Sequence, residues 1–229
     1  FLELNQSAGQ LAQKAASDST EVVKVAGSLP PLNGSYRPDR VLNREAIEPI
    51  YRQQSEALFP YVDVFLCETM STIQEAVSAL SVVSELGKPV LVGLTLHDEQ
   101  RGKLRSGESL QDAIYALNKF NPEGIVANCS LPERISDAMP TLVDSGLTYR
   151  GGYANAFCSI PKDWLLDGEK DTDGKLEIRE DLSPDRYRQF VIEWIEKGAN
   201  FIGGCCGTTA EHIKSINTWL ESKKHQGAD

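Results

Sequence analysis

The chain lacks the features that mark secreted, membrane-embedded or nucleic-acid-binding proteins. Its 229 residues include five cysteines, an odd and small number, which argues against a disulfide scaffold and for a reducing compartment. Acidic residues outnumber basic ones and give a net charge of −10, which disfavours non-specific attraction to nucleic acid or anionic lipid. No apolar run approaches the roughly 18–20 residues of a membrane helix, and residues 1–5 do not resemble a signal peptide. We therefore expect a cytoplasmic protein without nucleic-acid or membrane partners.

Nucleotide-binding fingerprints and linkers are missing as well. No Gly-x-Gly-x-x-Gly sequence follows a predicted strand, and there is no P-loop, which weakens a dinucleotide-binding interpretation. Hydrophobic residues make up 41% and charged residues 24% of the chain, as is usual for a globular protein with a real core. Because no stretch is rich in proline, glycine or serine, we expect residues 1–229 to form one domain.

What the chain does contain is a repeated alternation of short apolar strands and amphipathic helices. Strands are predicted at residues 21–27, 61–67, 89–95, 124–129, 148–153 and 201–203, and helices at residues 1–16, 44–58, 71–86, 110–120, 132–144, 184–197 and 209–221. Apolar strands that alternate with helices indicate a parallel sheet covered by helices. The fold class is therefore α/β, either a (β/α) barrel or a doubly wound open sheet.

The most distinctive local pattern is Gly203-Gly204-Cys205-Cys206-Gly207. It follows the last predicted strand, and its glycines allow the sharp turn that two adjacent metal-binding cysteines need. Cys129 follows another predicted strand. Because the C-terminal ends of barrel strands share one face, the three thiols can converge. Three thiolates could hold one zinc ion and leave its fourth position open, which is the mark of a catalytic zinc site.

A helix is predicted to start directly after this cysteine pair. Thr208 and Glu211 match the capping-box pattern, which predicts Thr208 as the N-cap residue. The amides and the positive dipole end of that helix would then lie beside Cys206 and favour its thiolate form. His212, inside the same helix, is expected at the surface.

Burial as a small apolar side chain is the alternative for each cysteine, because cysteine is among the most buried residue types. It is the preferred interpretation for Cys67 and Cys158, each of which stands alone. For Cys205 and Cys206 a vicinal disulfide is possible but strained. Spacing alone leaves zinc binding and these alternatives open, since the choice of Cys129 rests on its place at a strand end.

Several motifs, in this order, resemble the homocysteine S-methyltransferase family. They are Ala26-Gly27-Ser28-Leu29-Pro30-Pro31, Phe65-Leu66-Cys67-Glu68-Thr69, Asn128-Cys129-Ser130, Tyr153-Ala154-Asn155-Ala156 and Gly203-Gly204-Cys205-Cys206-Gly207-Thr208-Thr209. The resemblance covers nearly the whole chain and implies a (β/α)8 barrel of the TIM type. The first two βα units of that barrel are expected to be absent, so that residues 1–229 would be an N-terminally incomplete barrel. The chain also has Tyr153-Ala154-Asn155 where the family has Tyr-Pro-Asn, which makes this loop less rigid.

The resemblance implies an enzyme that transfers a methyl group from a small onium donor to the thiol of homocysteine, giving methionine. Zn²⁺ would be held by Cys129, Cys205 and Cys206, with no catalytic side chain beyond this site. S-methylmethionine or S-adenosylmethionine is the favoured donor and betaine the next, because no cobalamin-binding or folate-binding module is visible. The alternatives are a non-catalytic zinc-binding or thiol-binding barrel and a redox protein that uses a vicinal disulfide.

The resemblance also implies substrate-binding residues. Glu68 matches the family carboxylate that holds the amino group of homocysteine, although a solvated acid at a strand end is the simpler interpretation of the residue alone. Asn128 and Asn155 match residues in or behind the substrate site, and each could equally form a turn.

Overall fold

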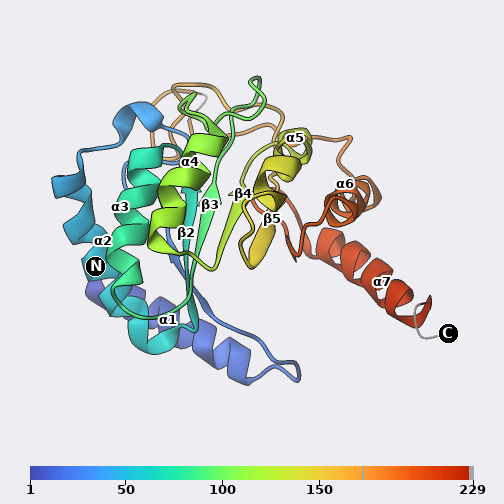
Figure 1. Cartoon of the computed structure of the whole chain (residues 1–229), viewed down its shortest axis with the longest axis horizontal. Helices are drawn as coiled ribbons and strands as arrows, with labels where there is room; N and C mark the ends of the chain where they lie inside the picture. The colour runs from blue at the N-terminus through green and yellow to red at the C-terminus, as the bar shows by residue number, and fades with distance from the viewer. Residues whose placement is uncertain (172, 227–229) are drawn as a thin grey trace.

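The computed structural model describes residues 1–171 and 173–226. Six strands form one sheet: β1 (Ala26–Leu29), β2 (Val64–Met70), β3 (Val90–Leu94), β4 (Gly124–Asn128), β5 (Tyr149–Tyr153) and β6 (Phe201–Ile202). The helices are α1 (Leu2–Ser17), α2 (Arg44–Leu58), α3 (Ile73–Ser84), α4 (Leu110–Leu117), α5 (Pro132–Val143), α6 (Pro184–Glu196) and α7 (Ala210–Gln226). Figure 1 shows that the helices alternate with the strands along the chain.

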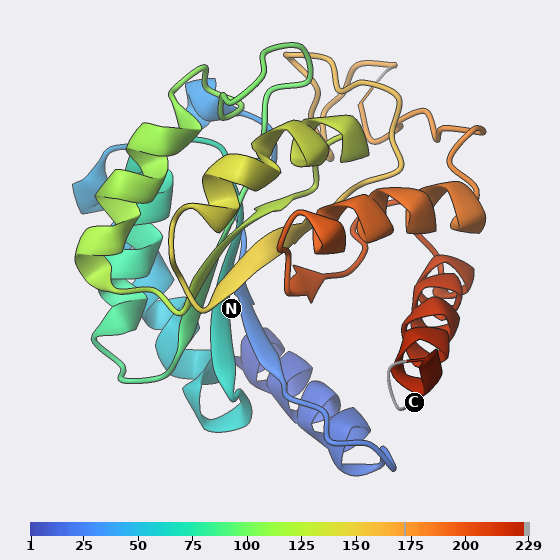
Figure 2. The same cartoon turned by 45° about the vertical axis from the view of Figure 1, so that its right-hand side comes forward.

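The predicted α/β class with a parallel sheet is confirmed. Each strand pairs in parallel with its sequence neighbours, in the order β1-β2-β3-β4-β5-β6. Parallel neighbours need a crossover connection, which the intervening helices supply. Helix α3 packs on β2 and β3, and α5 packs on β4 and β5, as Figure 2 shows from a second direction. Among the described residues the sheet is open, with β1 and β6 at its two edges.

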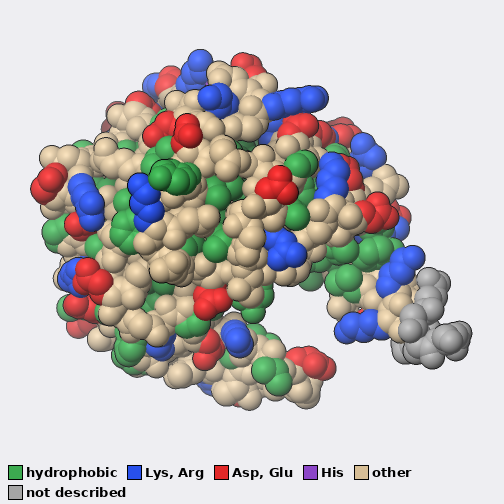
Figure 3. Space-filling view, in the orientation of Figure 1, with side chains coloured by type: hydrophobic (Ala, Val, Ile, Leu, Met, Phe, Trp, Pro, Cys, Tyr) green, Lys and Arg blue, Asp and Glu red, His purple; other side chains and the backbone are tan. Residues whose placement is uncertain are grey.

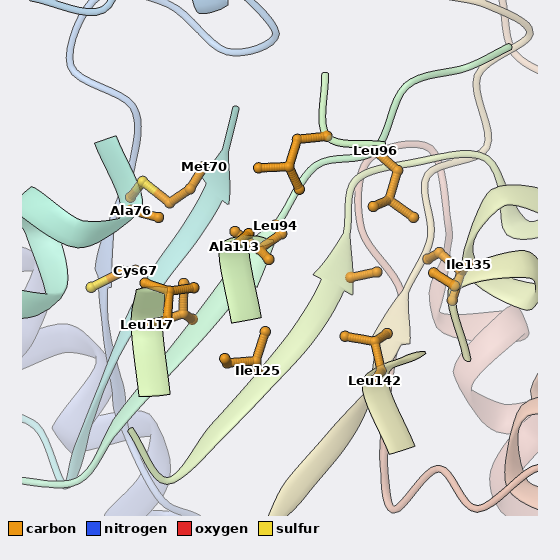
Figure 4. Packing of buried hydrophobic residues seen from close by; sticks show 14 of the residues in the cluster. Cys67, Met70, Ala76, Leu94, Leu96, Ala113, Leu117, Ile125, Ile135 and Leu142 are labelled. Atoms are coloured by element: carbon orange, nitrogen blue, oxygen red, sulfur yellow. The ribbon is translucent and has the colours of Figure 1, made fainter. Parts of the chain in front are cut away.

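The helices cover one face of the sheet, and the strand sequences show why. Along β2 the side chains of Phe65 and Cys67 are buried, whereas Leu66 and Glu68 are partly exposed. This alternation follows from the period of two in a strand, with one face toward the helices. Figure 4 shows the packed side, where Cys67, Leu117 and Ile125 belong to one apolar cluster. The opposite face of β2 therefore stays accessible, and it carries Glu68.

The first strand is shorter and later than predicted. Residues 21–25 were expected in it, but the strand starts at Ala26, and Val22 is 98% exposed. Pairing with β2 begins at Ala26 opposite Val64, preceded only by bonds from the Asp63 and Val64 amides to the Val25 carbonyl, so residues 21–24 have no place in the pairing register. The β-branched residues alone could not show where the neighbouring strand ends, and strand pairing decided the boundary.

Helix α1 lies at the β1 edge with its apolar side chains in solvent. Leu4 and Leu11 are 76% and 69% exposed, and Gly9 is the buried residue of this helix. A Cβ atom at Gly9 would lie 2.7 Å from the side chain of Tyr61, so the helix meets the body of the molecule through its backbone. Figure 3 shows a notch between the part that carries α1 and the part that carries α7. Within the described part of the chain, no helix combines the length and the apolar character needed to cross a membrane.

Candidate metal centre

Three thiols meet just beyond the C-terminal ends of β4 and β6. The sulfur of Cys205 lies 2.8 Å from that of Cys129 and 3.9 Å from that of Cys206, and the Cys129 and Cys206 sulfurs are 3.6 Å apart. All three are free thiols. The fold thus brings together residues that are 76 and 77 positions apart in the sequence.

The sulfur spacing fits a tetrahedral metal ion with thiolate ligands. A Zn–S bond length of about 2.3 Å implies sulfur–sulfur distances of about 3.8 Å. The two longer distances, 3.6 and 3.9 Å, agree with this value, and the 2.8 Å pair would have to open by about 1 Å. Among the described residues, no His, Asp or Glu ligand atom joins this group. The arrangement could therefore hold a soft divalent cation through three sulfurs and leave a fourth position for an external ligand.

The three thiols share their protons unequally. Hydrogen bonds from Cys129 and then from Cys205 lower the pKa of the Cys206 thiol to about 3. The pKa of Cys205 is raised, first by its bond to Cys129 and then by that to Cys206. Of these thiols, Cys206 is thus the one whose ionised form its neighbours favour most. Such a partly ionised group is prepared for a cation, because metals bind the thiolate form.

Two glycines are needed for the turn that presents the cysteine pair. Gly207 has φ +78°, a left-handed conformation that favours glycine. A Cβ atom at Gly204 would lie 2.3 Å from Oγ1 of Thr208, whereas one at Gly203 would make an ordinary contact at 3.4 Å. The turn is fixed to the segment after β5, because the Cys205 amide donates to the Ala154 carbonyl.

The predicted capping box after the turn is wrong. Helix α7 begins at Ala210, one residue later than expected. The Thr208 hydroxyl donates to the Cys205 carbonyl at 2.6 Å, and the Thr209 amide donates to Nδ1 of His212 at 3.1 Å. The imidazole thus accepts from the backbone amide before the helix, the role that the capping box assigned to the Glu211 carboxylate. The cysteine turn continues through Thr208, so the helix could not start there.

His212 is buried and not at the surface as predicted. It is 7% exposed, and its Nε2 lies 3.0 Å from the carbonyl oxygen of Leu182. Since Nδ1 accepts from the Thr209 amide, Nε2 carries the proton and donates to this carbonyl. The ring of His212 meets that of Tyr187 edge-on at 5.7 Å. His212 thus ties α7 to the segment before α6 by a hydrogen bond and to α6 by a ring contact, which an isolated histidine in a sequence could not reveal.

Glu68 projects from β2 on the face that the helices leave accessible. Its carboxylate accepts hydrogen bonds from the Ser28 hydroxyl at 2.5 Å and from the Tyr153 hydroxyl at 2.9 Å. Burial and then the negative charge of Glu68 raise the pKa of Tyr153 well above its usual value, so this phenol remains a donor. Glu68 is thus a fixed and partly exposed anion.

Asn128 is engaged entirely with the residue that follows Glu68. It is fully buried; its Oδ1 accepts from the Thr69 amide and its Nδ2 donates to the Thr69 hydroxyl, both at 2.9 Å. Thr69 has φ +62°, a conformation that is uncommon for a residue with a Cβ atom. Gly93 makes room for this pair, since a Cβ atom there would lie 2.6 Å from the Asn128 oxygen. Asn128 therefore holds the backbone beside Glu68.

Asn155 and the two lone cysteines have local roles in the structure. Asn155 is 1% exposed, and its side-chain oxygen accepts from the Phe157 amide two residues later, as in an Asx turn. The side chain of Cys67, on β2, is buried, as predicted for a small apolar side chain. Cys158, for which burial was also predicted, is only partly buried.

Tyr36 is a site residue that the sequence did not reveal. Its hydroxyl lies 2.8 Å from the sulfur of Cys129, although 93 positions separate the two residues. Tyr36 and Cys129 both have positive φ, +65° and +45°. Burial and then the negative charge of Cys129 raise the pKa of Tyr36 far above its usual value. No motif marks this tyrosine, because it stands in an irregular loop and its backbone conformation is not encoded in a local pattern.

A cavity of about 850 Å³ is lined in part by Tyr36 and by several charged side chains. Its walls are charged and include Arg37, Asp98, Arg105 and Lys162. Asp98 and Arg105 form a largely buried ion pair at 2.6 Å. The three clustered cysteines do not line this cavity, so Tyr36 separates it from the thiols.

Comparison with known proteins gives one family and one fold. The family model for homocysteine S-methyltransferase matches residues 1–220. The homocysteine methyltransferase MmuM from Escherichia coli is similar in its apo form, with a TM-score of 0.72 and 21% identity over 95% of this chain and 72% of that chain. Its metallated form gives 0.74 and 23%, over 95% and 70%.

The carboxyl transferase domain of Rhizobium etli pyruvate carboxylase is similar at a TM-score of 0.54 and 11% identity, over 97% of this chain and 38% of that chain. At such identities the likeness is one of fold, and the likeness to MmuM confirms the barrel type among the two α/β architectures that the sequence allowed.

Proposed function

The chain belongs to the homocysteine S-methyltransferase family, and from this premise we propose that it transfers a methyl group from a small onium donor to the thiol of homocysteine, giving methionine. The observation that carries the proposal is the cluster of three cysteine sulfurs within 4.8 Å of one another. In the same proposal, residues 1–229 form one barrel domain.

We propose that Cys129, Cys205 and Cys206 hold Zn²⁺. The set of three soft donors with no fourth protein ligand supports this choice. When bound, zinc supplies the means to keep a coordinated substrate thiol in its thiolate form at neutral pH, which matters because the thiolate is the nucleophile. The turn at Gly204 and Gly207 keeps the two adjacent sulfurs on the same side of the backbone.

Glu68 is proposed to bind the ammonium group of homocysteine. Its two oxygens accept bonds from Ser28 and Tyr153, and a carboxylate offers about four acceptor positions, so two remain for a substrate. Asn128 and Asn155 are proposed to act at the substrate site by holding the backbone on which it is built. Their hydrogen bonds to Thr69 and Phe157 support this role more than direct contact.

The transfer itself would be an in-line displacement. The bond between the methyl carbon and the donor's onium atom breaks and its electron pair stays on the leaving group, while a carbon–sulfur bond forms at homocysteine. Little charge develops, so the protein's task is to position the reactants. S-methylmethionine or S-adenosylmethionine is the preferred donor and betaine the next. A cationic donor suits the acidic chain, whose net charge is −10.

Metal analysis and a transfer assay test the proposal together. Under reducing conditions we expect one zinc per chain, and the transfer of a methyl group from S-methylmethionine to homocysteine. Cys206→Ala should lose both, while Cys158→Ala, outside the cluster, should keep both. Zinc binding without transfer to homocysteine from any onium donor would favour the non-catalytic barrel. A metal-free protein with a reversible Cys205–Cys206 disulfide would contradict the proposal and favour the redox alternative.

A further inference from the structure

We propose that the Tyr36 hydroxyl donates a hydrogen bond to the Cys129 thiolate and thereby directs the incoming methyl group away from this cysteine and onto the substrate sulfur. The inference rests on the proposed function and assigns a positioning residue to it. Tyr36 would act through a metal ligand and would not touch the reacting atoms.

The contact is held firmly by its surroundings. Tyr36 is 4% exposed and packs in a small cluster with Cys129, Ile160 and Trp164. The rings of Tyr36 and Trp164 lie 5.9 Å apart, and the guanidinium group of Arg105 lies 5.5 Å from the centre of the Tyr36 ring. A tyrosine enclosed in this way has little freedom to turn its hydroxyl away from the sulfur.

The backbone on both sides of the contact is strained. Tyr36 has φ +65° and Cys129 has φ +45°, and a bulky side chain at positive φ is a genuine outlier. Residues in such uncommon conformations cluster at functional sites, where the surrounding structure enforces them. Two of them that face each other through one hydrogen bond support a function for this contact.

The direction of the hydrogen bond follows from the metal-bound state. A thiolate that ligates a metal carries no proton, so the hydroxyl must be the donor. In that state the proton between the two groups belongs to the Tyr36 hydroxyl. Cys129 is the one hydrogen-bond partner that the described residues offer to this hydroxyl.

Such a bond would help the enzyme to methylate homocysteine and not its own cysteines. The three cysteine sulfurs and the homocysteine sulfur could each attack the donor's methyl group. In every case the carbon–onium bond breaks, its electron pair leaves with the donor, and a carbon–sulfur bond forms. Methylation of a cysteine would destroy the site. The nucleophilicity of a thiolate falls as its pKa falls, with a Brønsted coefficient of about 0.4–0.5, so each hydrogen bond donated to Cys129 makes it a poorer competitor.

The experiment uses the zinc-loaded chain with methyl iodide and without homocysteine. Methylation of each cysteine is followed by intact mass and peptide mapping. We expect Cys129 to be methylated about three to ten times faster in Tyr36→Phe than in the wild type, because the lost hydrogen bond makes this thiolate more nucleophilic. Tyr51→Phe is the matched control, because it removes another buried hydroxyl, which donates to the Pro30 carbonyl, and it should leave the rate unchanged.

A second substitution separates the hydrogen bond from simple shielding. With 3-fluorotyrosine at position 36 the hydroxyl remains and becomes a stronger donor, so methylation of Cys129 should be slower than in the wild type. This arm also decides the matter if Tyr36→Phe does not fold. Equal rates at Cys129 in the wild type and the variants, with zinc present in all of them, would overturn this inference alone. A wild-type protein without zinc would overturn the proposed function, and this inference with it.

Discussion

At the scale of single residues, the site is built from polar side chains that are already hydrogen-bonded to one another. Glu68 has two partners, Asn128 bonds to Thr69 through both the oxygen and the nitrogen of its amide, and the Cys206 sulfur lies within hydrogen-bonding distance of the Cys129 and Cys205 sulfurs. The bonds of Glu68 and Asn128 hold these side chains in place before any ligand arrives, so little ordering remains there on binding, whereas the Cys129 and Cys205 sulfurs must still move apart by about 1 Å to hold a metal ion. Of these groups, Glu68 and Cys206 combine charge with access to solvent, which makes them the groups most able to meet a ligand.

Glu68→Gln tests the ammonium contact. The amide keeps the size of the side chain but loses the charge, and hydrogen bonds to charged groups are worth about 1.5–3 kcal/mol. We therefore expect KM for homocysteine to rise by about 10–150-fold, with zinc content unchanged. Glu85→Gln is the control, since that carboxylate pairs with Arg52 at the surface. An unchanged KM in Glu68→Gln would remove Glu68 from the substrate site.

At the scale of elements, the loop between β6 and α7 and the ends of α6 and α7 form one unit. The Tyr187 hydroxyl, on α6, donates to the Gly203 carbonyl at 2.7 Å and accepts from the Ala154 amide at 3.0 Å. One buried phenol thus connects the segment after β5 to the cysteine turn. The edge-on contact with His212 extends the connection to α7.

Gly204→Ala should displace the cysteine turn. The added methyl group would meet Oγ1 of Thr208 at 2.3 Å, closer than any real contact, so the turn must move. Zinc affinity, measured by competition with a chelator, should fall by about five- to 150-fold, in line with the roughly 1–3 kcal/mol that overpacking costs. Gly203→Ala, where the nearest contact is 3.4 Å, should bind zinc nearly as well as the wild type. Equal losses of zinc affinity in the two variants would show that the close contact at Gly204 does not explain the loss.

Tyr187→Phe should weaken both the fold and the metal site. It leaves the Ala154 amide and the Gly203 carbonyl without their partner, and an unsatisfied buried group costs about 1–3 kcal/mol. Urea denaturation should show a loss of this size, together with weaker zinc binding. Tyr115→Phe, on a side chain that is 70% exposed, should change neither. Full stability in Tyr187→Phe would mean that other groups replace the hydroxyl.

At the scale of the whole molecule, the long connection between β5 and α6 is fastened to the barrel by charge. Arg179, in this connection, binds Glu133 on α5 and Asp181, both at 2.8 Å. Burial is the largest single influence on Glu133 and opposes its ionisation, but the hydrogen bond from Arg179, a backbone hydrogen bond and the charge of Arg179 together outweigh it, so the pKa of Glu133 lies below its usual value. The connection therefore depends on a carboxylate that must stay ionised.

Acid should loosen this attachment. A carboxyl group with a lowered pKa in the folded state adds stability above its unfolded pKa, and that stability is lost as the pH falls through the folded pKa. The free energy of unfolding should therefore decline below about pH 4. Urea denaturation between pH 3 and pH 7 checks this, and Glu133→Gln should show a shallower decline than the wild type. Identical pH profiles would mean that other carboxylates account for the acid sensitivity.

Much of the fold could be predicted because local patterns repeat. The predicted helix at residues 44–58 coincides with α2, since Asn43 caps its start with a side-chain bond to the Ala46 amide. The parallel order followed from apolar strands that alternate with helices. The first strand was placed too early because its extent depends on the neighbouring strand. The N-cap of α7 was predicted wrongly because the Thr208 hydroxyl donates to the Cys205 carbonyl within the preceding turn.

The sequence by itself determined the kinds of groups at the site: a cysteine pair among glycines, a third cysteine after a strand, and an acid on another strand. Only the tertiary structure decided how these groups are engaged. The tertiary structure set the sulfur spacing and turned Asn128 toward Thr69. It also buried His212 of α7 against Tyr187 of α6 and brought Tyr36 to Cys129. Residue types and short-range periodicity can be read directly from the sequence. A hydrogen bond between residues 93 positions apart forms only when the whole sheet and its loops have packed.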